Sequence, residues 1–291
     1  MRFGHAIAPD GAPNLFGEKD GRRVELGVVM NDAPGTLDDL LTDPDGPARA
    51  TESLERAFEQ GKGEPLSEEE RLLPPVLRPG KIAAIGLNYF DHCRELGLEP
   101  PTEPVVFAKF STSLRGHGDD VAWDPAITSE VDWEAELGVV IGRRTHNADA
   151  VEAERSIFGY TVVNDVTARD LQRTEQQWVR AKSLDSFCPI GPVVTTADEI
   201  GDPQSLSVRS RVNGEKMQDS STSEMIFGVV ELVSRLSRSF TLEPGDIVAT
   251  GTPRGVGAFR NPPIFLGDGD VMEMEIEGIG TLRNSCRVIR S

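Results

Sequence analysis

The chain has 291 residues, enough for two domains or for one large β-rich domain with an appendage. Apolar residues make up 38% of it, which suffices for a hydrophobic core and argues against wholesale disorder. Acidic residues outnumber basic ones 48 to 30, and the formal net charge of −18 would repel nucleic acids and anionic membranes. We therefore expect neither as a partner.

We expect neither a secretory signal peptide nor a membrane-spanning segment. No segment approaches the roughly 18 consecutive apolar residues of a membrane-spanning helix, and the start has no apolar region of the signal-peptide kind. The three cysteines, Cys93, Cys188 and Cys286, show no C-x-x-C spacing and fit reduced thiols. These features predict a cytoplasmic protein that binds a small molecule.

The first 75 residues differ in pattern from the rest. Short strands are expected at residues 2–8 and 23–30, and an amphipathic helix at residues 48–60. A proline-rich extended connection follows at residues 72–80. We predict a small N-terminal α/β domain, residues 1–75, and a second domain, residues 76–291.

Strand signals dominate the second domain. Strands are expected at residues 82–87, 105–110, 137–141, 159–163, 206–212, 246–250 and 271–276. Helices are fewer, at residues 149–155, 167–177 and 224–240. The regular strand–helix alternation of a doubly wound sheet is absent, so the predicted fold class is α+β with a large β component.

Two glutamates, Glu134 and Glu136, precede the apolar strand at residues 137–141. If the strand already includes both, its period of two places the carboxylates on one face and turns Ala135 away. Two like charges this close need a cation, and a hard divalent cation such as Mg²⁺ takes oxygen ligands. The alternative is an acidic strand face in water, which the pair taken alone favours.

Other polar residues follow predicted strands. His92 and Glu95 are three apart, so one helical turn places them together, either as a base with its orienting carboxylate or as a surface ion pair. Asp165 ends the strand at 159–163 and is either a helix N-cap or an oxygen ligand.

The residues that follow leave similar choices open. Arg169 and Gln172 share a helix side with Asp165 and would reach a bound carboxylate or form an ordinary polar face. Lys182 would stabilise an oxyanion or bind only solvent. The glycine-rich loop at residues 251–257 has no phosphate-binding pattern, but its glycines permit tight turns and Thr252 could present a hydroxyl to a ligand.

Together, six motifs resemble those of the fumarylacetoacetate hydrolase superfamily. In chain order they are G-L-N-Y-x-D-H-x-x-E, E-P-V-V-F-x-K, D-W-E-A-E-L-x-V-V-I-G, G-Y-T-V-V-N-D-V-T-A-R-D-L-Q, K-S-L-D-S-F-C-P-I-G-P and P-G-D-I-V-A-T-G-T-P-R-G-V-G. They follow the family's order across residues 80–289, and six motifs in order are a specific signal. The first 75 residues share only the small extra domain of many bacterial members.

The resemblance implies a fold and a set of residue roles. The fold is a mixed β-sheet roll with few helices, usually a homodimer. Glu134, Glu136 and Asp165 bind Mg²⁺ or Mn²⁺, and water and substrate complete the shell. His92 and Glu95 form the catalytic dyad, with Lys182 as electrophilic partner. The substrate-binding residues that it implies are Arg169, Gln172, Thr252, Lys109 and Tyr89.

The expected activity is hydrolysis of the C3–C4 bond of an acylpyruvate or another 2,4-dioxo acid. The Glu95–His92 pair would deprotonate a water that attacks the C4 carbonyl, Lys182 would steady the oxyanion, and a metal-bound enolate would remain. The same site would serve oxaloacetate decarboxylation, or isomerisation or tautomerisation of 2-hydroxy-dienoates in aromatic catabolism. The motifs leave these alternatives open. A non-catalytic binding protein would require a missing dyad or lysine, and all three residues are present.

Overall fold

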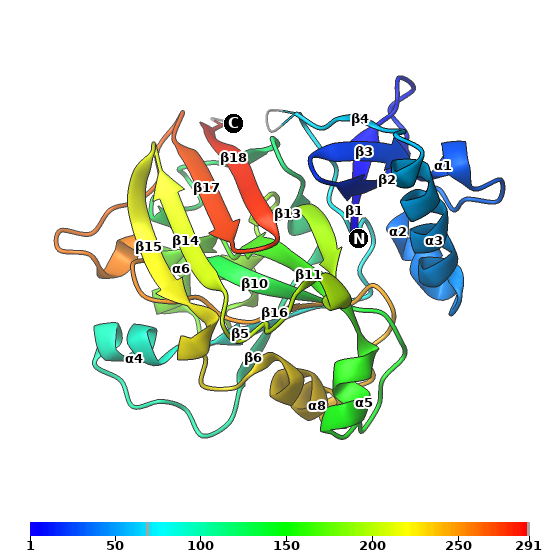
Figure 1. Cartoon of the computed structure of the whole chain (residues 1–291). Coiled ribbons are helices and arrows are strands. Elements are labelled where there is room, and N and C mark those ends of the chain that lie inside the picture. The colour runs from blue at the N-terminus through cyan, green and yellow to red at the C-terminus, as the bar shows by residue number, and fades with distance from the viewer. Residues whose placement is uncertain (68–69, 290–291) are drawn as a thin grey trace.

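The computed structural model describes residues 1–67 and 70–289 (Figure 1). They form eight α-helices around two large β-sheets and one two-stranded sheet, which confirms the predicted β-rich α+β fold. No helix in the described ranges is long and apolar enough to cross a membrane.

The largest sheet has 11 strands and runs through the middle of the molecule (Figure 1). Its strand order is β4-β3-β2-β1-β13-β11-β10-β16-β5-β6, and β7 pairs with β13 beside this path. The strands are β1 (Arg2–Ile7), β2 (Pro13–Lys19), β3 (Arg22–Glu25), β4 (Glu64–Pro65), β5 (Ile82–Gly86), β6 (Val105–Lys109), β7 (Leu114–Arg115), β10 (Ala135–Ile141), β11 (Ile157–Asn164), β13 (Cys188–Thr196) and β16 (Ile247–Ala249).

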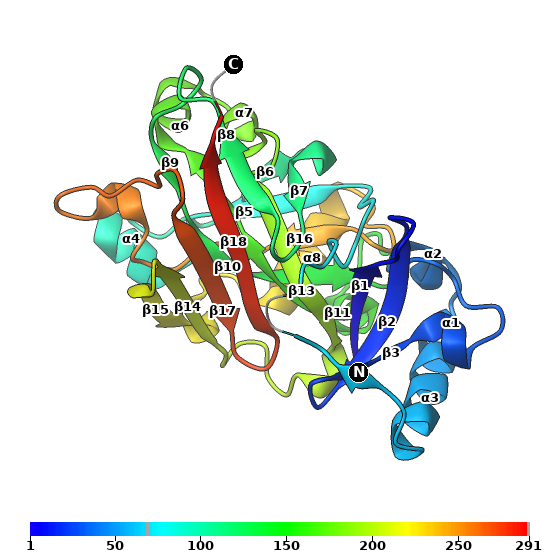
Figure 2. The same cartoon turned by 90° about the horizontal axis from the view of Figure 1, so that it is seen from above.

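A five-stranded sheet packs on one face of this central sheet, where β14, β17 and β18 contact β10, β11 and β13 (Figure 2). Its order is β15-β14-β17-β18-β8, formed by β8 (Asp120–Trp123), β14 (Ser207–Val212), β15 (Glu215–Ser221), β17 (Val271–Ile276) and β18 (Gly280–Val288). The small third sheet pairs β9 (Val131–Asp132) with β12 (Thr167–Ala168).

The alternation of side chains in β10 decides on which face a polar site can form. Ala135, Leu137 and Val139 point into the apolar core between the two large sheets. Val140 packs into a separate core on the opposite face, and Glu136 shares that side of the strand. The carboxylate of Glu136 is thereby directed away from the five-stranded sheet.

The helices lie mostly at the ends and edges of the central sheet (Figures 1 and 2). They are α1 (Leu26–Val29), α2 (Leu37–Thr42), α3 (Gly46–Glu59), α4 (Phe90–Leu96), α5 (Ala150–Ser156), α6 (Arg169–Thr174), α7 (Val179–Lys182) and α8 (Val229–Ser239). Single 3₁₀ turns occur at Ser111–Ser113, Ala197–Glu199, Thr222–Glu224 and Gly257–Phe259.

Two predicted helices are shorter in the structure than in the sequence pattern. The helix expected at 167–177 begins only with α6, because Thr167 and Ala168 pair with β9. The helix expected at 224–240 begins only with α8, because Phe227 is bound through its backbone N–H and C=O to the side chain of Asn88. The strand expected at 23–30 ends as β3, and α1 follows it.

The N-terminal segment extends the central sheet. β1 pairs antiparallel with β13, with Phe3 opposite Val194, and α1, α2 and α3 lie beside the β1–β3 strands (blue in Figure 1). Leu54 of α3 shares an apolar core with Val163 of β11 and Ile190 of β13. The sheet is therefore continuous across the expected boundary at residue 75, and the division into two domains stays a prediction.

Candidate metal centre and active site

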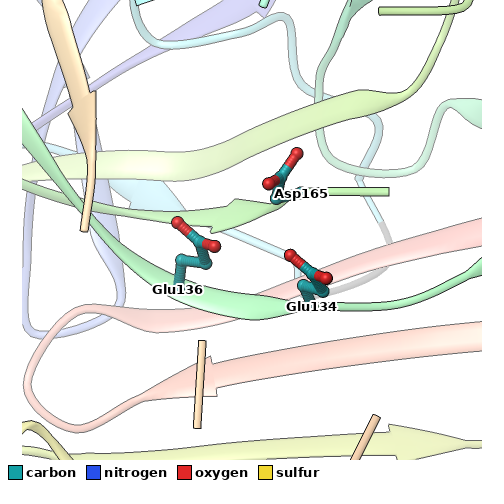
Figure 3. Close-up of side chains that lie close together, drawn as sticks. All are labelled: Glu134, Glu136 and Asp165. Atoms are coloured by element: carbon teal, nitrogen blue, oxygen red, sulfur yellow. The ribbon is translucent and has the colours of Figure 1, made fainter. Parts of the chain in front are cut away.

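Three buried carboxylates come together at the ends of two neighbouring strands (Figure 3). Glu134 lies directly before β10, Glu136 lies within it, and Asp165 directly follows β11. Each offers an oxygen atom, and these three atoms all lie within 4.8 Å of one another. The structure thus brings together the three residues expected to bind Mg²⁺ or Mn²⁺.

Backbone hydrogen bonds fix the positions of these carboxylates. The antiparallel register of β10 and β11 places Ala135 opposite Asn164. The backbone N–H of Asp165 donates to the carbonyl of Glu134 at 2.9 Å, and the N–H of Glu134 donates to the Asn164 side-chain oxygen at 3.1 Å. The two strand ends are therefore tied to each other where the carboxylates project.

Two buried lysines contact the cluster. The Lys182 Nζ lies 2.7 Å from an oxygen of Glu134 and 2.7 Å from an oxygen of Asp165. The Lys109 Nζ lies 2.5 Å from the other Asp165 oxygen and also donates to the carbonyls of Lys182 and Val166. Asp165 is thus held between two ammonium groups.

Arg169 joins the cluster from the start of α6. Its Nε donates to Asp132 at 2.8 Å, its Nη2 lies 2.7 Å from Glu134 Oε1, and its Nη1 donates to the side-chain oxygen of Gln172 at 2.9 Å. Asp132 is fully buried. Sequence reasoning missed Asp132, although Asp132, Glu134 and Glu136 follow one another at the period of a strand.

The charges in this cluster are unevenly balanced. Burial opposes the ionisation of Glu134, but the cations of Lys182 and Arg169 outweigh that effect and lower its pKa to about 2. Burial raises the pKa of Glu136 well above its usual value, and the negative charges of Asp165 and Glu134 raise it further. A divalent cation among these oxygens would supply the missing positive charge, so the donor set fits Mg²⁺ or Mn²⁺.

The His92–Glu95 pair lies on the short helix α4. His92 Nδ1 lies 3.0 Å from Glu95 Oε2, and Glu95 Oε1 accepts a hydrogen bond from the backbone N–H of Gly255 at 3.0 Å. The helix itself is anchored by Asp91, which accepts a hydrogen bond of 2.7 Å from the Ser220 hydroxyl. Nε2 is therefore the ring nitrogen of His92 that remains for a substrate.

A cavity of about 290 Å³ connects the dyad with the carboxylates. Of the predicted residues, those lining it are His92, Glu134, Glu136, Arg169, Gln172, Lys182 and Thr252. The aromatic rings of Phe107, Trp178 and Phe259 form part of its wall. Asp165, Glu95 and Lys109 are not among the lining residues, but each contacts one: Asp165 and Lys109 contact Lys182, and Glu95 contacts His92.

Two residues expected to bind substrate have other surroundings in the structure. Tyr89 is fully buried outside the cavity lining, and its hydroxyl has no hydrogen-bond partner among the described residues. Thr252 lines the cavity, but its hydroxyl donates to the Ala135 carbonyl at 3.0 Å and accepts from Gln218 at 2.8 Å. For both residues, substrate binding stays a prediction.

The glycine-rich loop supplies backbone donors to the acidic side chains. Gly251 N–H donates to Glu136 at 2.9 Å, Gly255 N–H to Glu95 at 3.0 Å and Gly257 N–H to Asp132 at 2.7 Å. Gly255 has φ of +100°, and a Cβ there would lie 2.4 Å from the Met217 carbonyl oxygen. The sequence indicated the tight turns, but it did not indicate that the loop connects the dyad with the carboxylate cluster.

Comparison with known proteins identifies the family of this chain. The family model described as "Fumarylacetoacetate (FAA) hydrolase C-terminal" matches residues 81–287. The chain belongs to the fumarylacetoacetate hydrolase family. Among curated members, it is 41% identical over 285 residues to the bovine (Bos taurus) protein named oxaloacetate tautomerase FAHD2A, mitochondrial, covering 94% of this chain and 88% of that one.

Solved structures of fumarylacetoacetate hydrolase family members have the same fold. A fumarylacetoacetate hydrolase from Exiguobacterium antarcticum superposes with a TM-score of 0.86 at 36% identity, covering 99% of this chain and 100% of that one. A maleylpyruvate hydrolase from Sphingobium sp. SYK-6, solved with manganese(II) and pyruvate, superposes with a TM-score of 0.80 at 26% identity and covers 99% of both chains.

Proposed function

We propose that this enzyme interconverts the keto and enol forms of oxaloacetate or a closely related 2-oxo acid, with a divalent metal ion. The observation that carries the proposal is one cavity that His92, Lys182 and the buried carboxylates of Glu134 and Glu136 all face. The identity to a protein named as an oxaloacetate tautomerase supports the substrate class. The proposal departs from the hydrolysis expected from the motifs: it shares its substrate with the decarboxylase alternative and its type of reaction with the tautomerase alternative.

The metal site would be formed by Glu134, Glu136 and Asp165, whose oxygens lie within 4.8 Å of one another. Mg²⁺ or Mn²⁺ bound there would supply Lewis-acid polarisation of a 2-oxo acid, which makes the hydrogens on C3 more acidic. The raised pKa of Glu136, caused by burial and then by Asp165 and Glu134, supports a need for added positive charge.

His92 would carry the proton transfer. Its Nε2 takes a proton from C3 of the keto acid, and Glu95, 3.0 Å from Nδ1, stabilises the imidazolium that forms. As the C2–C3 double bond forms, negative charge moves to the 2-oxo oxygen, where the Lys182 ammonium can steady it. The proton that His92 accepted then returns to that oxygen by way of water, which completes the enol and restores the neutral ring, and the reverse sequence returns the keto acid.

Arg169 and Gln172 would orient the substrate. The guanidinium of Arg169 is held by Asp132 on one side and lies against Glu134 on the other, so its position is fixed before substrate enters. Gln172 accepts from Arg169 through its side-chain oxygen, which leaves its amide N–H groups to donate to a carboxylate.

The test is the rate of keto–enol interconversion of oxaloacetate, followed by the absorbance of the enol. We expect activity with Mg²⁺ or Mn²⁺ that falls to the uncatalysed rate with EDTA, and a loss of about 100-fold or more in His92→Asn. A matched control is His146→Asn, because His146 lies outside the cavity lining. Full activity in EDTA, or near-wild-type turnover by His92→Asn, would contradict the proposal.

Hydrolysis of an acylpyruvate is the second candidate. The 3.0 Å contact of His92 with Glu95 favours it, because such a pair can also deprotonate a water. Decarboxylation of oxaloacetate needs no attacking base, so it should survive His92→Asn. Incubation with a panel of 2-oxo and 2,4-dioxo acids separates the three reactions, because hydrolysis releases a second acid, decarboxylation releases CO₂ and tautomerisation releases neither.

Location and assembly stay predictions of the sequence. The sequence predicts a cytoplasmic protein and the family resemblance implies a homodimer, whereas the name of the bovine relative places that protein in mitochondria.

A further inference from the structure

One cationic side chain at the cavity, that of Arg173, has no role in the proposed keto–enol reaction. Arg173 lies on α6, four residues after Arg169, so the two side chains share a helix face one turn apart. Arg173 lines the same cavity as Arg169, but its side chain is exposed whereas that of Arg169 is buried. Arg173 therefore marks the solvent side of the cavity.

The surroundings of Arg173 leave its donors available. Its Nη2 lies 2.6 Å from Glu130 Oε2, its ion-pair partner among the described residues, and the other guanidinium nitrogens belong to a side chain that is 57% exposed. The lining of the same cavity also includes the apolar side chains of Leu96, Leu98 and Trp178. A guanidinium beside apolar side chains at a cavity mouth suits a carboxylate, which it can bind through two parallel hydrogen bonds.

The buried charges of the site, with a divalent metal ion bound, would be balanced by one substrate carboxylate. The buried groups around the cluster comprise four carboxylates and three cations: Asp132, Glu134, Glu136, Asp165, Lys109, Arg169 and Lys182. These groups together carry a net charge of −1 when all are ionised. A bound divalent metal ion would change the net charge to +1, which a single substrate carboxylate would neutralise. A second carboxylate would need another cation, and among the described residues that line the cavity Arg173 is the one permanently cationic side chain besides Arg169 and Lys182.

We propose that Arg173 binds the distal carboxylate of the substrate and makes the enzyme selective for short 2-oxo dicarboxylates over 2-oxo monocarboxylates. This inference rests on the proposed function, because it places the 2-oxo acid end of the substrate at the carboxylate cluster of Glu134, Glu136 and Asp165. The step from Arg169 to Arg173 is about 6 Å along the helix, comparable with the reach of a four-carbon diacid.

The test uses two inert 2-hydroxy acids with the same head, L-malate and L-lactate, of which only malate has a distal carboxylate. Calorimetric titration in excess MgCl₂ should show malate binding about tenfold to 100-fold more tightly than lactate to the wild type. Arg173→Met should bring this ratio close to one and leave lactate binding unchanged. Arg173→Lys, which keeps the charge but not the planar fork, should retain part of the preference.

The matched control is Arg180→Met. Arg180 is also an exposed arginine paired with a glutamate, Glu175, but it does not line the cavity. This variant should keep the wild-type ratio, so a general loss of surface charge is separated from the loss of a carboxylate partner.

Several results would overturn the inference: a wild type that binds the two acids equally or binds neither, or an Arg173→Met variant that keeps the preference for malate. Failure of the proposed function would look different. In that case the preference for malate would persist and depend on Arg173, while oxaloacetate would not be tautomerised above the uncatalysed rate.

Discussion

At the scale of single residues, Asp132 connects the separate parts of the site. It accepts hydrogen bonds from the Arg169 side chain and from the backbone N–H groups of Gly257 and Ala258, at 2.7 to 3.0 Å. Arg169 in turn lies against Glu134. A buried carboxylate such as Asp132 stabilises the surrounding structure only while all of its partners are present, because the loss of one partner leaves a buried charge uncompensated.

We therefore predict that Asp132→Asn lowers the free energy of unfolding by about 3 kcal/mol, because it leaves the buried Arg169 guanidinium without its full counter-charge. Urea unfolding of the purified variant measures this change. The control is Asp120→Asn, whose half-exposed carboxylate lies 3.7 Å from the exposed Arg287 and should contribute less than about 1 kcal/mol. Equal stability of the two variants would contradict the account of Asp132.

Which residues belong to the site could be predicted, but their partners could not. Glu134, Glu136, His92 and Lys182 were expected from residue type and motif, and all four line one cavity. Their pairings depend on contacts between distant segments, such as Lys182 with Glu134, and no local pattern encodes those contacts. For this reason the role of Lys109 as a partner of Asp165, rather than a residue that lines the cavity, was not foreseen.

At the scale of elements, several strands were predicted from their apolar pattern, and others, such as β13 and β18, were missed. The seven strands expected after residue 80 are all present, with ends that differ by no more than two residues. β13 was missed, because Pro189, Gly191 and Pro192 interrupt its pattern and almost all of it is buried. Its neighbours β1 and β11 supply the pairing that holds such a sequence extended.

One contact between elements should make stability depend on pH. His5 of β1 is buried; its Nε2 accepts the backbone N–H of Leu37, the first residue of α2, and its Nδ1 lies 3.0 Å from the Pro74 carbonyl. Burial lowers the pKa of His5, although Pro74, Asp38 and Asp39 act in the opposite direction. The folded chain therefore prefers the neutral ring, whose Nε2 can accept that hydrogen bond.

Because the folded-state pKa is lowered, the unfolded chain binds the proton more readily, and stability falls as the pH drops below about 6.5. Above that pH the contribution of His5 is complete. We predict that His5→Gln loses part of the wild-type change in unfolding free energy between pH 7 and pH 5, as measured by urea unfolding at both values. An unchanged pH dependence in His5→Gln would contradict this role.

At the scale of the whole molecule, the two large sheets separate packing from chemistry. The five-stranded sheet covers one face of the central sheet with an apolar core, and the carboxylates project from strand ends on the other face (Figures 2 and 3). The sequence predicted the fold class and the cluster, because both follow from strand periodicity and motif order. It did not predict that the N-terminal strands continue the same sheet, since β1 pairs with a strand far away in the sequence, with Arg2 opposite Thr195.

The central claim is that Glu134, Glu136 and Asp165 form one divalent-metal site. Titration of Mn²⁺ into the protein, followed by electron paramagnetic resonance, tests it most directly, because the signal of free Mn²⁺ disappears on binding. We predict one tight Mn²⁺ per chain in the wild type and an affinity at least about tenfold weaker in Glu136→Gln, which keeps the shape of the side chain but loses a charged ligand. Absence of tight binding by the wild type, or equal binding by Glu136→Gln, would contradict it.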